Sequence, residues 1–155
     1  MPAELPFREP PCLIAAAELQ RRVAELAAQI SADYRGRDLL VVGVLKGAFV
    51  FLADLVRALT IPVRCDFVKL SSYGLGTESS GAVRLQLDAS LPVAGAEVLI
   101  VEDIIDTGTT TSWLIDHLRR QGAAGVKLCA LLDKPARRRN SVSIDYLGFT
   151  IPDHF

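Results

Sequence analysis

VLIVEDIIDTGTT, residues 98–110, joins a strand pattern to a helix pattern through a short acidic turn. Residues 98–101 are all branched and apolar, which is typical of a strand buried on both faces of a sheet. Glu102 and Asp103 follow at once, and Asp106 comes three residues after Asp103. A strand, an acidic loop and a helix in this order indicate an α/β protein.

The Thr/Gly turn in this segment predicts a place for a phosphate group. A helix over residues 109–120 begins there, and the first turn of a helix has unpaired backbone N–H groups and a partial positive charge. Gly108 allows the backbone to approach a ligand closely, and the neighbouring threonine hydroxyls add donors. The two adjacent carboxylates would repel a phosphate, but they suit a diol, a divalent cation or both. These groups together fit a ribose 5-phosphate.

A simpler explanation of the same segment is a capped helix. Thr107 or Thr109 could serve as the N-cap, and Asp106 could complement the helix dipole. This explanation leaves Glu102 and Asp103 unaccounted for, because two adjacent charges at a strand end need solvent or a ligand. The binding site is therefore the favoured interpretation.

Strand and helix patterns alternate along the rest of the chain. Helices are predicted over residues 13–33, 48–59 and 109–120, and strands over residues 39–45, 63–71, 83–87, 97–101, 126–132 and 144–149. This alternation predicts an α/β fold with a doubly wound, mainly parallel sheet flanked by helices, in which residues 83–87 form an antiparallel excursion. Ligands bind at the carboxyl ends of the strands in such sheets, so the chemistry is expected just after Leu45, Val101 and Leu132.

The composition limits the class of protein. With 155 residues, of which 50% are hydrophobic, the chain is expected to form one domain with one core. The net charge of −1 gives no reason to expect nucleic-acid or membrane binding, and no apolar run is long enough to span a bilayer. Cys12, Cys65 and Cys129 are scattered, which argues against a disulfide framework and a zinc site. Without a signal-peptide pattern, the expected location is the cytoplasm.

Five segments carry a resemblance to a known family. VLIVEDIIDTGTT is similar to the phosphoribosyl-pyrophosphate motif of the type I phosphoribosyltransferases. VGVLKGAFVFLADLVRAL, SSYGLGTESSG, LLDKPARR and LGFTIPDHF resemble segments of hypoxanthine-guanine phosphoribosyltransferases, particularly the bacterial ones. The resemblance implies transfer of the 5-phosphoribosyl group from phosphoribosyl pyrophosphate to hypoxanthine or guanine, which gives IMP or GMP and pyrophosphate. It also implies Mg²⁺ as the cofactor and a homodimer or homotetramer as the assembly.

The resemblance implies roles for the residues of the acidic turn. Glu102 and Asp103 correspond to the acids that hold the ribose hydroxyls close to a magnesium ion, which the substrate itself largely chelates. Asp106 corresponds to the family's proposed general base, which faces N7 of the purine. The 5′-phosphate loop of the family corresponds to Thr107, Gly108, Thr109 and Thr110.

Two lysines receive roles in the same way. Lys46 and Gly47 resemble the pyrophosphate loop of the family, in which a cis peptide precedes the lysine, so a cis bond is expected between Leu45 and Lys46. A surface lysine before a helix is the simpler alternative. Lys134 matches the lysine that binds O6 of guanine or hypoxanthine, and a cationic donor there disfavours the amino group of adenine.

The remaining assignments concern mobile or terminal positions. Ser72 and Tyr73 begin a Gly- and Ser-rich stretch, residues 72–81, which matches a catalytic loop that closes over the site; an ordinary mobile loop is the alternative. Phe155 matches the ring that stacks on the purine, and a frayed terminal residue is the alternative. Arg138 is a candidate phosphate ligand, unless residues 137–139 form a solvated basic turn.

The resemblance stops at Phe155, whereas the family continues with further residues that contact the base, a second magnesium ion and the pyrophosphate. The chain is therefore expected to be either a fragment or a shortened member, with part of the family domain absent. Xanthine as the acceptor, a nucleic-acid-binding regulator and a catalytically silent binder of phosphoribosyl pyrophosphate are the competing functions. The near-neutral charge counts against the regulator, and Asp106 with Lys134 counts against the silent binder.

Overall fold

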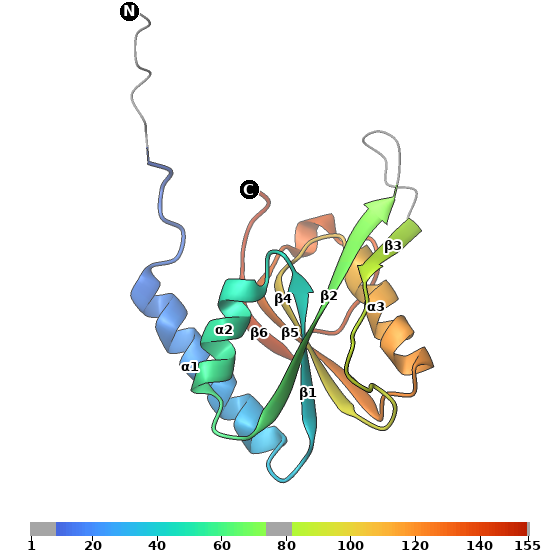
Figure 1. Ribbon diagram of the computed structural model, residues 1–155. Coiled ribbons are helices and arrows are strands. Elements are labelled where there is room, and N and C mark those ends of the chain that lie inside the picture. Colours follow the sequence, from blue (N-terminus) through green and yellow to red (C-terminus); the bar gives the residue numbers. More distant parts are fainter. Residues whose placement is uncertain (1–8, 74–81, 155) are drawn as a thin grey trace, which may run out of the picture.

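The computed structural model describes residues 9–73 and 82–154, and these form a six-stranded sheet flanked by helices (Figure 1). The helices are α1 (Ala16–Asp33), α2 (Phe49–Ala58) and α3 (Thr109–Arg120), with a short 3₁₀ turn over Pro135–Arg137. The strands are β1 (Leu39–Leu45), β2 (Val63–Tyr73), β3 (Ala82–Leu87), β4 (Glu97–Ile105), β5 (Gly125–Asp133) and β6 (Tyr146–Thr150).

The strand order is β3-β2-β1-β4-β5-β6, and every neighbouring pair is parallel except β2 with β3. The prediction of a doubly wound, mainly parallel sheet with one antiparallel excursion is thus confirmed. The chain winds outward from β1 in one direction and from β4 in the other, so the topological switch point lies between these two strands. Ligands bind at such a point in open α/β sheets.

Two apolar cores cover the two faces of the sheet. On one face, α1 and α2 pack through residues such as Leu26, Ile30 and Leu55 against alternate residues of β1 and β4. On the other face, α3 packs through Leu114 and Leu118 against the intervening strand residues. Figure 1 shows α1 and α2 together on one side of the sheet and α3 on the opposite side. Because β1 is buried over nearly its whole length, its run LLVVGVL fits a strand that is covered on both faces.

Three boundaries differ from the sequence prediction in ways that matter for the site. β4 continues to Ile105, four residues beyond the predicted end, so Glu102 and Asp103 belong to the strand and not to the loop. The longer strand is stabilised by pairing with β5, which itself extends to Asp133. β2 extends through Tyr73 by pairing with β3, so the predicted loop over residues 72–81 begins two residues too early.

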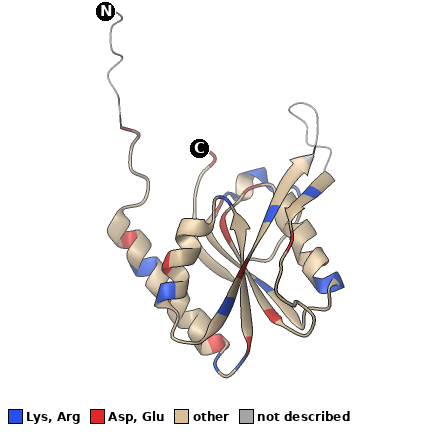
Figure 2. Cartoon of the chain, viewed as in Figure 1, with Lys and Arg blue, Asp and Glu red and all other residues tan. Residues whose placement is uncertain are grey.

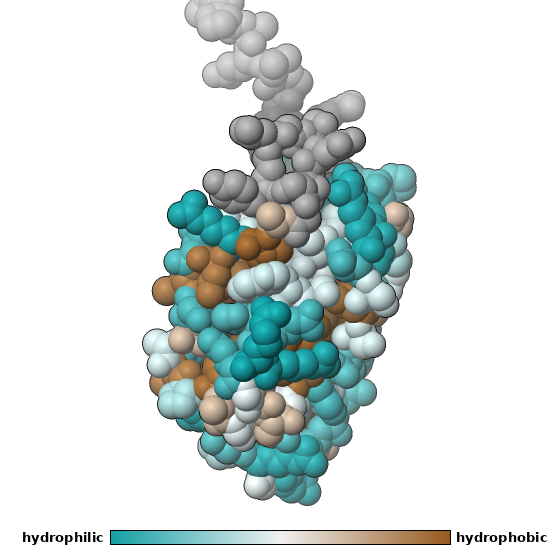
Figure 3. Space-filling view, turned by 90° about the vertical axis from the view of Figure 1, so that its right-hand side faces the viewer, coloured by the Kyte–Doolittle hydropathy of each residue, from teal (hydrophilic) through white to brown (hydrophobic). Residues whose placement is uncertain are grey.

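Figures 2 and 3 show how charged and hydrophobic residues are distributed. Charges of both signs are spread over the helices and the strand ends in Figure 2, in line with the net charge of −1. Hydrophilic residues cover most of the face shown in Figure 3, with small hydrophobic areas between them. Within residues 9–73 and 82–154, no helix is long and apolar enough to cross a membrane.

Candidate active site

Most of the predicted site residues lie where β1, β4 and β5 end, namely Lys46, Gly47, Glu102, Asp103, residues 106–110 and Lys134. Ile105 of β4 pairs with Asp133 of β5, and the backbone N–H of Lys134 donates to the carbonyl of Ile105 at 2.9 Å. Asp106 and Lys134 therefore leave the sheet side by side from neighbouring strands. The sequence separates these two residues widely, and only the parallel register brings them together.

The turn after β4 has the geometry expected of an anion-binding helix start. Gly108 has a φ of 81°, a left-handed conformation that favours glycine, and α3 begins at the next residue. The backbone N–H of Thr109 donates to Oγ1 of Thr107 at 3.3 Å. Thr110 lies in the first turn of α3, where backbone N–H groups lack partners within the helix. Such a turn can receive a phosphate.

Glu102 and Asp103 form a tightly spaced acidic pair near the end of β4. The backbone N–H of Asp103 donates to Oε1 of Glu102 at 3.0 Å, and that of Ile104 donates to Oδ1 of Asp103 at 2.8 Å. Burial, together with the nearby Asp103 carboxyl, raises the pKa of Glu102 to about 9. A second negative charge is disfavoured here unless a cation or hydroxyl donors offset it.

These two acids offer hard oxygen ligands, which suit Mg²⁺ in a site where the substrate supplies further oxygens. In the part of the chain that the structure describes, no group of three or more His, Cys, Asp or Glu side chains could hold a metal ion. A protein cage for the ion is thus not formed by these residues, and a shared site with one or two carboxylates fits the donors that are present.

Lys46 and Gly47 follow β1, and Gly47 lies against the Asp103 carboxylate. The peptide bond between Leu45 and Lys46 is cis, as the resemblance predicted. Lys46 and Gly47 are exposed, and a Cβ at Gly47 would overlap with Oδ2 of Asp103. Only glycine at position 47 leaves room for the Asp103 carboxylate in its present place.

Lys134 is buried, with 3% of its surface exposed, although it is a lysine. Its Nζ lies 3.3 Å from Oδ1 of Asp153, which provides an opposite charge. Arg137 joins the same group of charges, because its Nε lies 3.8 Å from Oδ2 of Asp153. Lys134 directly follows β5, and its ammonium group can donate a hydrogen bond to a ligand oxygen.

Asp106 has two differently placed carboxylate oxygens. Oδ2 lies 3.5 Å from Nη1 of Arg137. Oδ1 is buried and has no hydrogen-bond partner among the described residues. A buried acceptor without a partner is uncommon, and at a functional site it marks a position where a ligand can supply the donor.

The three arginines after Lys134 differ in exposure: Arg137 and Arg139 are exposed, whereas Arg138 is partly buried. Arg138 donates through Nη2 to Oδ1 of Asp133 and through Nε to the carbonyl of Asp106 at 3.2 Å. Arg137 contacts the carboxylates of Asp106 and Asp153. The exposed side chains of Arg137 and Arg139 fit the expected solvated turn. The pairing of Arg138 with Asp133 was not predicted, because the sequence does not show that acids from other segments lie beside it, and these contacts do not test phosphate binding by Arg138.

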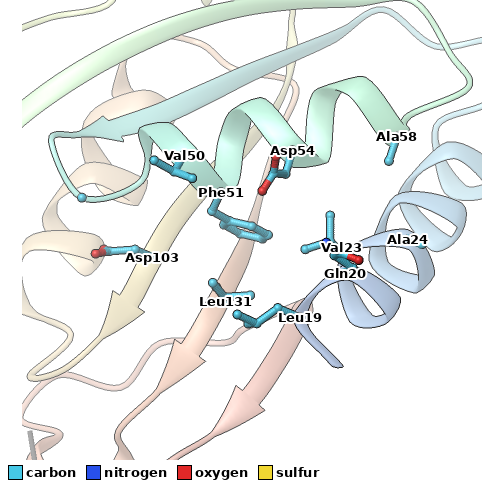
Figure 4. A pocket seen from close by; sticks show the side chains of 11 residues that line it. Leu19, Gln20, Val23, Ala24, Val50, Phe51, Asp54, Ala58, Asp103 and Leu131 are labelled. Atoms are coloured by element: carbon cyan, nitrogen blue, oxygen red, sulfur yellow. The ribbon is translucent and has the colours of Figure 1, made fainter. Parts of the chain in front are cut away.

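A groove of about 440 Å³ extends from Asp103 between α1 and α2. Figure 4 shows Phe51, Leu131 and Leu19 clustered in its middle and Asp103 at one end. Gly47 lines the same end of the groove. The apolar part of the groove was not anticipated from the sequence, because the residues that line it come from four separate segments.

The predicted closing-loop and stacking residues are placed only in part. Ser72, which is exposed, and Tyr73 are the last two residues of β2. They therefore belong to this strand and not to a loop. The rest of the predicted loop and Phe155 lie outside the described residues.

Asp133, Asn140 and Asp153 contact the site but were not singled out by sequence. Asp133 precedes Lys134 at the strand end, and this position is the one signal that could have marked it. Asn140 accepts a hydrogen bond from Oγ1 of Thr109 at 2.8 Å. Nothing in the sequence connects Asn140 or Asp153 with residues that are distant along the chain.

Known proteins resemble this chain over most of its length. Residues 15–155 match the phosphoribosyl transferase domain family. The bifunctional protein TilS/HprT of Listeria innocua is 48% identical over 143 residues, which cover 92% of this chain and 22% of that protein. A hypoxanthine-guanine phosphoribosyltransferase of Mycobacterium avium is 44% identical, with 99% of this chain and 79% of the relative covered. The chain thus spans about a fifth of the bifunctional relative.

Solved structures agree with this relationship. A hypoxanthine phosphoribosyltransferase from Staphylococcus aureus superposes with a TM-score of 0.90 at 37% identity, covering 94% of this chain and 79% of that one. A hypoxanthine-guanine phosphoribosyltransferase from Bacillus anthracis gives a TM-score of 0.87 at 43% identity, covering 94% of this chain and 84% of that one.

Proposed function

This chain belongs to the phosphoribosyl transferase domain family, and from that membership we propose that it transfers the 5-phosphoribosyl group of phosphoribosyl pyrophosphate to hypoxanthine or guanine. The products are IMP or GMP and pyrophosphate. The observation that carries the proposal is the pairing of Ile105 with Asp133, because it puts Asp106 and Lys134 next to each other. A carboxylate acceptor and a buried ammonium donor side by side complement the edge of a 6-oxopurine.

In the proposed reaction a ring nitrogen of the purine forms a bond to C1′ of the sugar. The bond between C1′ and the pyrophosphate oxygen breaks, pyrophosphate leaves with the bonding electrons, and the purine loses one proton. Asp106 accepts that proton or stabilises its position on N7, since Oδ1 is a buried acceptor without a partner in the described chain. Lys134 donates to O6, which selects against the 6-amino group of adenine.

We assign the 5′-phosphate to the turn formed by Thr107, Gly108, Thr109 and Thr110. The left-handed Gly108 and the start of α3 support this assignment, because they expose backbone N–H groups at a helix N-terminus. The threonine hydroxyls supply further donors. A 5′-phosphate held there would direct the ribose toward the end of β4, where Glu102 and Asp103 lie.

Glu102 and Asp103 are proposed to accept hydrogen bonds from the ribose hydroxyls and to bind Mg²⁺ together with substrate oxygens. Bound Mg²⁺ would offset the negative charge of the pyrophosphate and so make it a better leaving group. Lys46 and Gly47 are proposed to contact the pyrophosphate, and their position against the Asp103 carboxylate supports this. Ser72, Tyr73 and Phe155 keep their proposed roles in closing the site and stacking on the base.

The assembly and location are proposals of the same kind. We propose that the chain forms one phosphoribosyltransferase domain that assembles as a homodimer or homotetramer in the cytoplasm. Phe49 and Val50 support the assembly, because they are 59% and 56% exposed at the start of α2, beside the proposed pyrophosphate segment. Light scattering coupled to size-exclusion chromatography would measure the number of subunits.

The proposed function is tested by mixing the chain with phosphoribosyl pyrophosphate, hypoxanthine and Mg²⁺ and separating the products by chromatography. Equal amounts of IMP and pyrophosphate are expected, and chelation of Mg²⁺ should abolish both. Pyrophosphate without IMP would indicate hydrolysis of the donor and would contradict transfer to the base.

A further inference from the structure

The turn that follows β5 holds the loop that carries Asp106. We refer to residues 134–140 as the arginine turn and to residues 106–109 as the acid loop. The backbone N–H groups of Arg139 and Asn140 both donate to the carbonyl of Thr107, at 2.8 and 3.0 Å. Oγ1 of Thr109 donates to Oδ1 of Asn140. The acid loop is therefore supported by the arginine turn along most of its length.

Arg138 adds a side-chain contact at the first residue of the acid loop. Its Nε donates to the carbonyl of Asp106 at 3.2 Å, and its Nη2 donates to the carboxylate of Asp133. The side chains of Arg138 and Asp133 are 20% and 14% exposed, so the pair is largely withdrawn from water. The aliphatic stem of Arg138 packs on Gly108, because Cδ lies 3.0 Å from the position of a Cβ there.

We propose that the Arg138–Asp133 pair positions Asp106 for catalysis, which makes both members positioning residues in the reaction proposed above. The proposal rests on that proposed function. The carbonyl of Asp106 and the N–H of Thr107 belong to one rigid peptide plane. A guanidinium that holds this carbonyl therefore sets the direction of the acid and of the first N–H of the phosphate turn together.

The arrangement needs an arginine specifically. Two separate acceptors, the Asp133 carboxylate and the Asp106 carbonyl, are reached by two N–H groups of one planar guanidinium. An ammonium is a point charge without that fork geometry, so a lysine would not bridge the two acceptors in the same way. Because Arg138 is already paired with Asp133, its charge serves this bridge and not a substrate phosphate.

The test compares Arg138→Lys, Arg138→Met, Asp133→Asn and the double variant Asp133→Asn with Arg138→Met. Arg139→Ala is the matched control, because its exposed side chain lies next to Arg138 while its backbone N–H remains. Steady-state kinetics give kcat and the KM for phosphoribosyl pyrophosphate. Hydrogen–deuterium exchange of the full chain reports on amides of the acid loop and arginine turn, whether or not the chain is active.

Positioning predicts that kcat falls about 10- to 100-fold in each single variant, lysine included. The donor KM should rise by a smaller factor than kcat falls, because only the first N–H of the phosphate turn shares the peptide plane that Arg138 holds. The double variant should be no worse than either single change, because one pair is removed in all of them. Amides of the acid loop and arginine turn should exchange faster in these variants and stay as in wild type in Arg139→Ala.

Two outcomes would overturn the proposal. One is a raised donor KM with normal kcat that lysine restores, which would make Arg138 a phosphate ligand. The other is unchanged exchange in Asp133→Asn and Arg138→Met, whatever the activity. If the wild-type chain makes no nucleotide but exchange still changes locally, the proposed function fails and the support of the acid loop by the pair stands.

Discussion

Gly47 and Asp103 are packed closely together, because a Cβ at residue 47 would overlap with Oδ2 of the Asp103 carboxylate. Gly47 follows β1, and Asp103 lies near the end of β4, so the two residues stand on either side of the switch point of the sheet. Gly47, whose backbone is proposed to contact the pyrophosphate, is thus packed against Asp103, which is proposed to bind the ribose and Mg²⁺. A change at one position is expected to act through the other.

Gly47→Ala should therefore lower kcat/KM for phosphoribosyl pyrophosphate by about 10- to 100-fold, because a misplacement of about 1 Å at a reacting site has effects of this size. The melting temperature should change little, since residue 47 is exposed. Steady-state kinetics with Mg²⁺ titration measure the effect. Combined with Asp103→Ala, which removes the overlap, Gly47→Ala should add no further loss; a fully additive loss would show that the two residues act separately.

Asp106→Asn should lower kcat by about 10²- to 10⁴-fold, because an amide cannot accept a proton from the purine. Donor affinity should stay within about threefold, since the phosphate turn is intact. Calorimetric titration with phosphoribosyl pyrophosphate, alongside kinetics, separates the two effects. Asp116→Asn on the exposed surface of α3 is the control. A variant that retains wild-type turnover would remove Asp106 from the mechanism.

Lys134→Ala should reduce the preference for hypoxanthine over adenine, measured as the ratio of their kcat/KM values. The expected loss is about 10- to 100-fold, because a hydrogen bond to a charged group contributes about 1.5–3 kcal/mol. Asp153→Asn tests whether the neighbouring charge matters for the same step. It should keep most of the preference, since the proposed donor to O6 is Lys134 and Asp153 is the ion-pair partner of that lysine. An unchanged ratio in Lys134→Ala would contradict the assignment of O6 recognition.

Asp66, which lies away from the site, is expected to make a pH-dependent contribution to the free energy of unfolding. Burial acts to raise its pKa, but the N–H groups of Leu91, Phe67 and Ser90 outweigh burial, and the pKa is lowered. Since the folded pKa lies below the unfolded value of about 3.9, the stabilisation is present above that pH and is lost as the pH falls through the folded pKa.

Asp66→Asn should accordingly lower the free energy of unfolding by roughly 1–2 kcal/mol at pH 7. The difference from wild type should shrink as the pH drops below about 4. Urea unfolding between pH 3 and pH 7 gives both values, with Asp116→Asn as the surface control. A difference that stays constant over this range would show that the Asp66 charge is not responsible.

The sequence predicted the order and type of the elements well, because buried parallel strands leave continuous apolar runs such as residues 39–45. It did not predict that β4 continues through Glu102 to Ile105. Those residues are paired by hydrogen bonds to β5, and such long-range pairing outweighs the local preference of charged residues for a loop.

The meeting of the segments after Leu45, Val101 and Leu132 was predictable, because ligands bind at the carboxyl ends of parallel strands. Within the acid loop, the predicted turn at Gly108 and the helix that begins at Thr109 are both present. The contacts of Arg138 with Asp133 and of Asp153 with Lys134 depend on how a turn folds back on two strand ends. Spacing along the chain does not encode such contacts, and for that reason the pairing of Arg138 with Asp133 was not predicted.

The most direct measurement is a spectrophotometric assay of this chain with phosphoribosyl pyrophosphate and Mg²⁺ and, in separate reactions, hypoxanthine, guanine, xanthine and adenine. If the chain transfers the phosphoribosyl group to 6-oxopurines, we expect Mg²⁺-dependent formation of IMP and GMP, with little product from adenine. A folded chain that binds the donor but forms no nucleotide with any of the four bases would contradict this transfer.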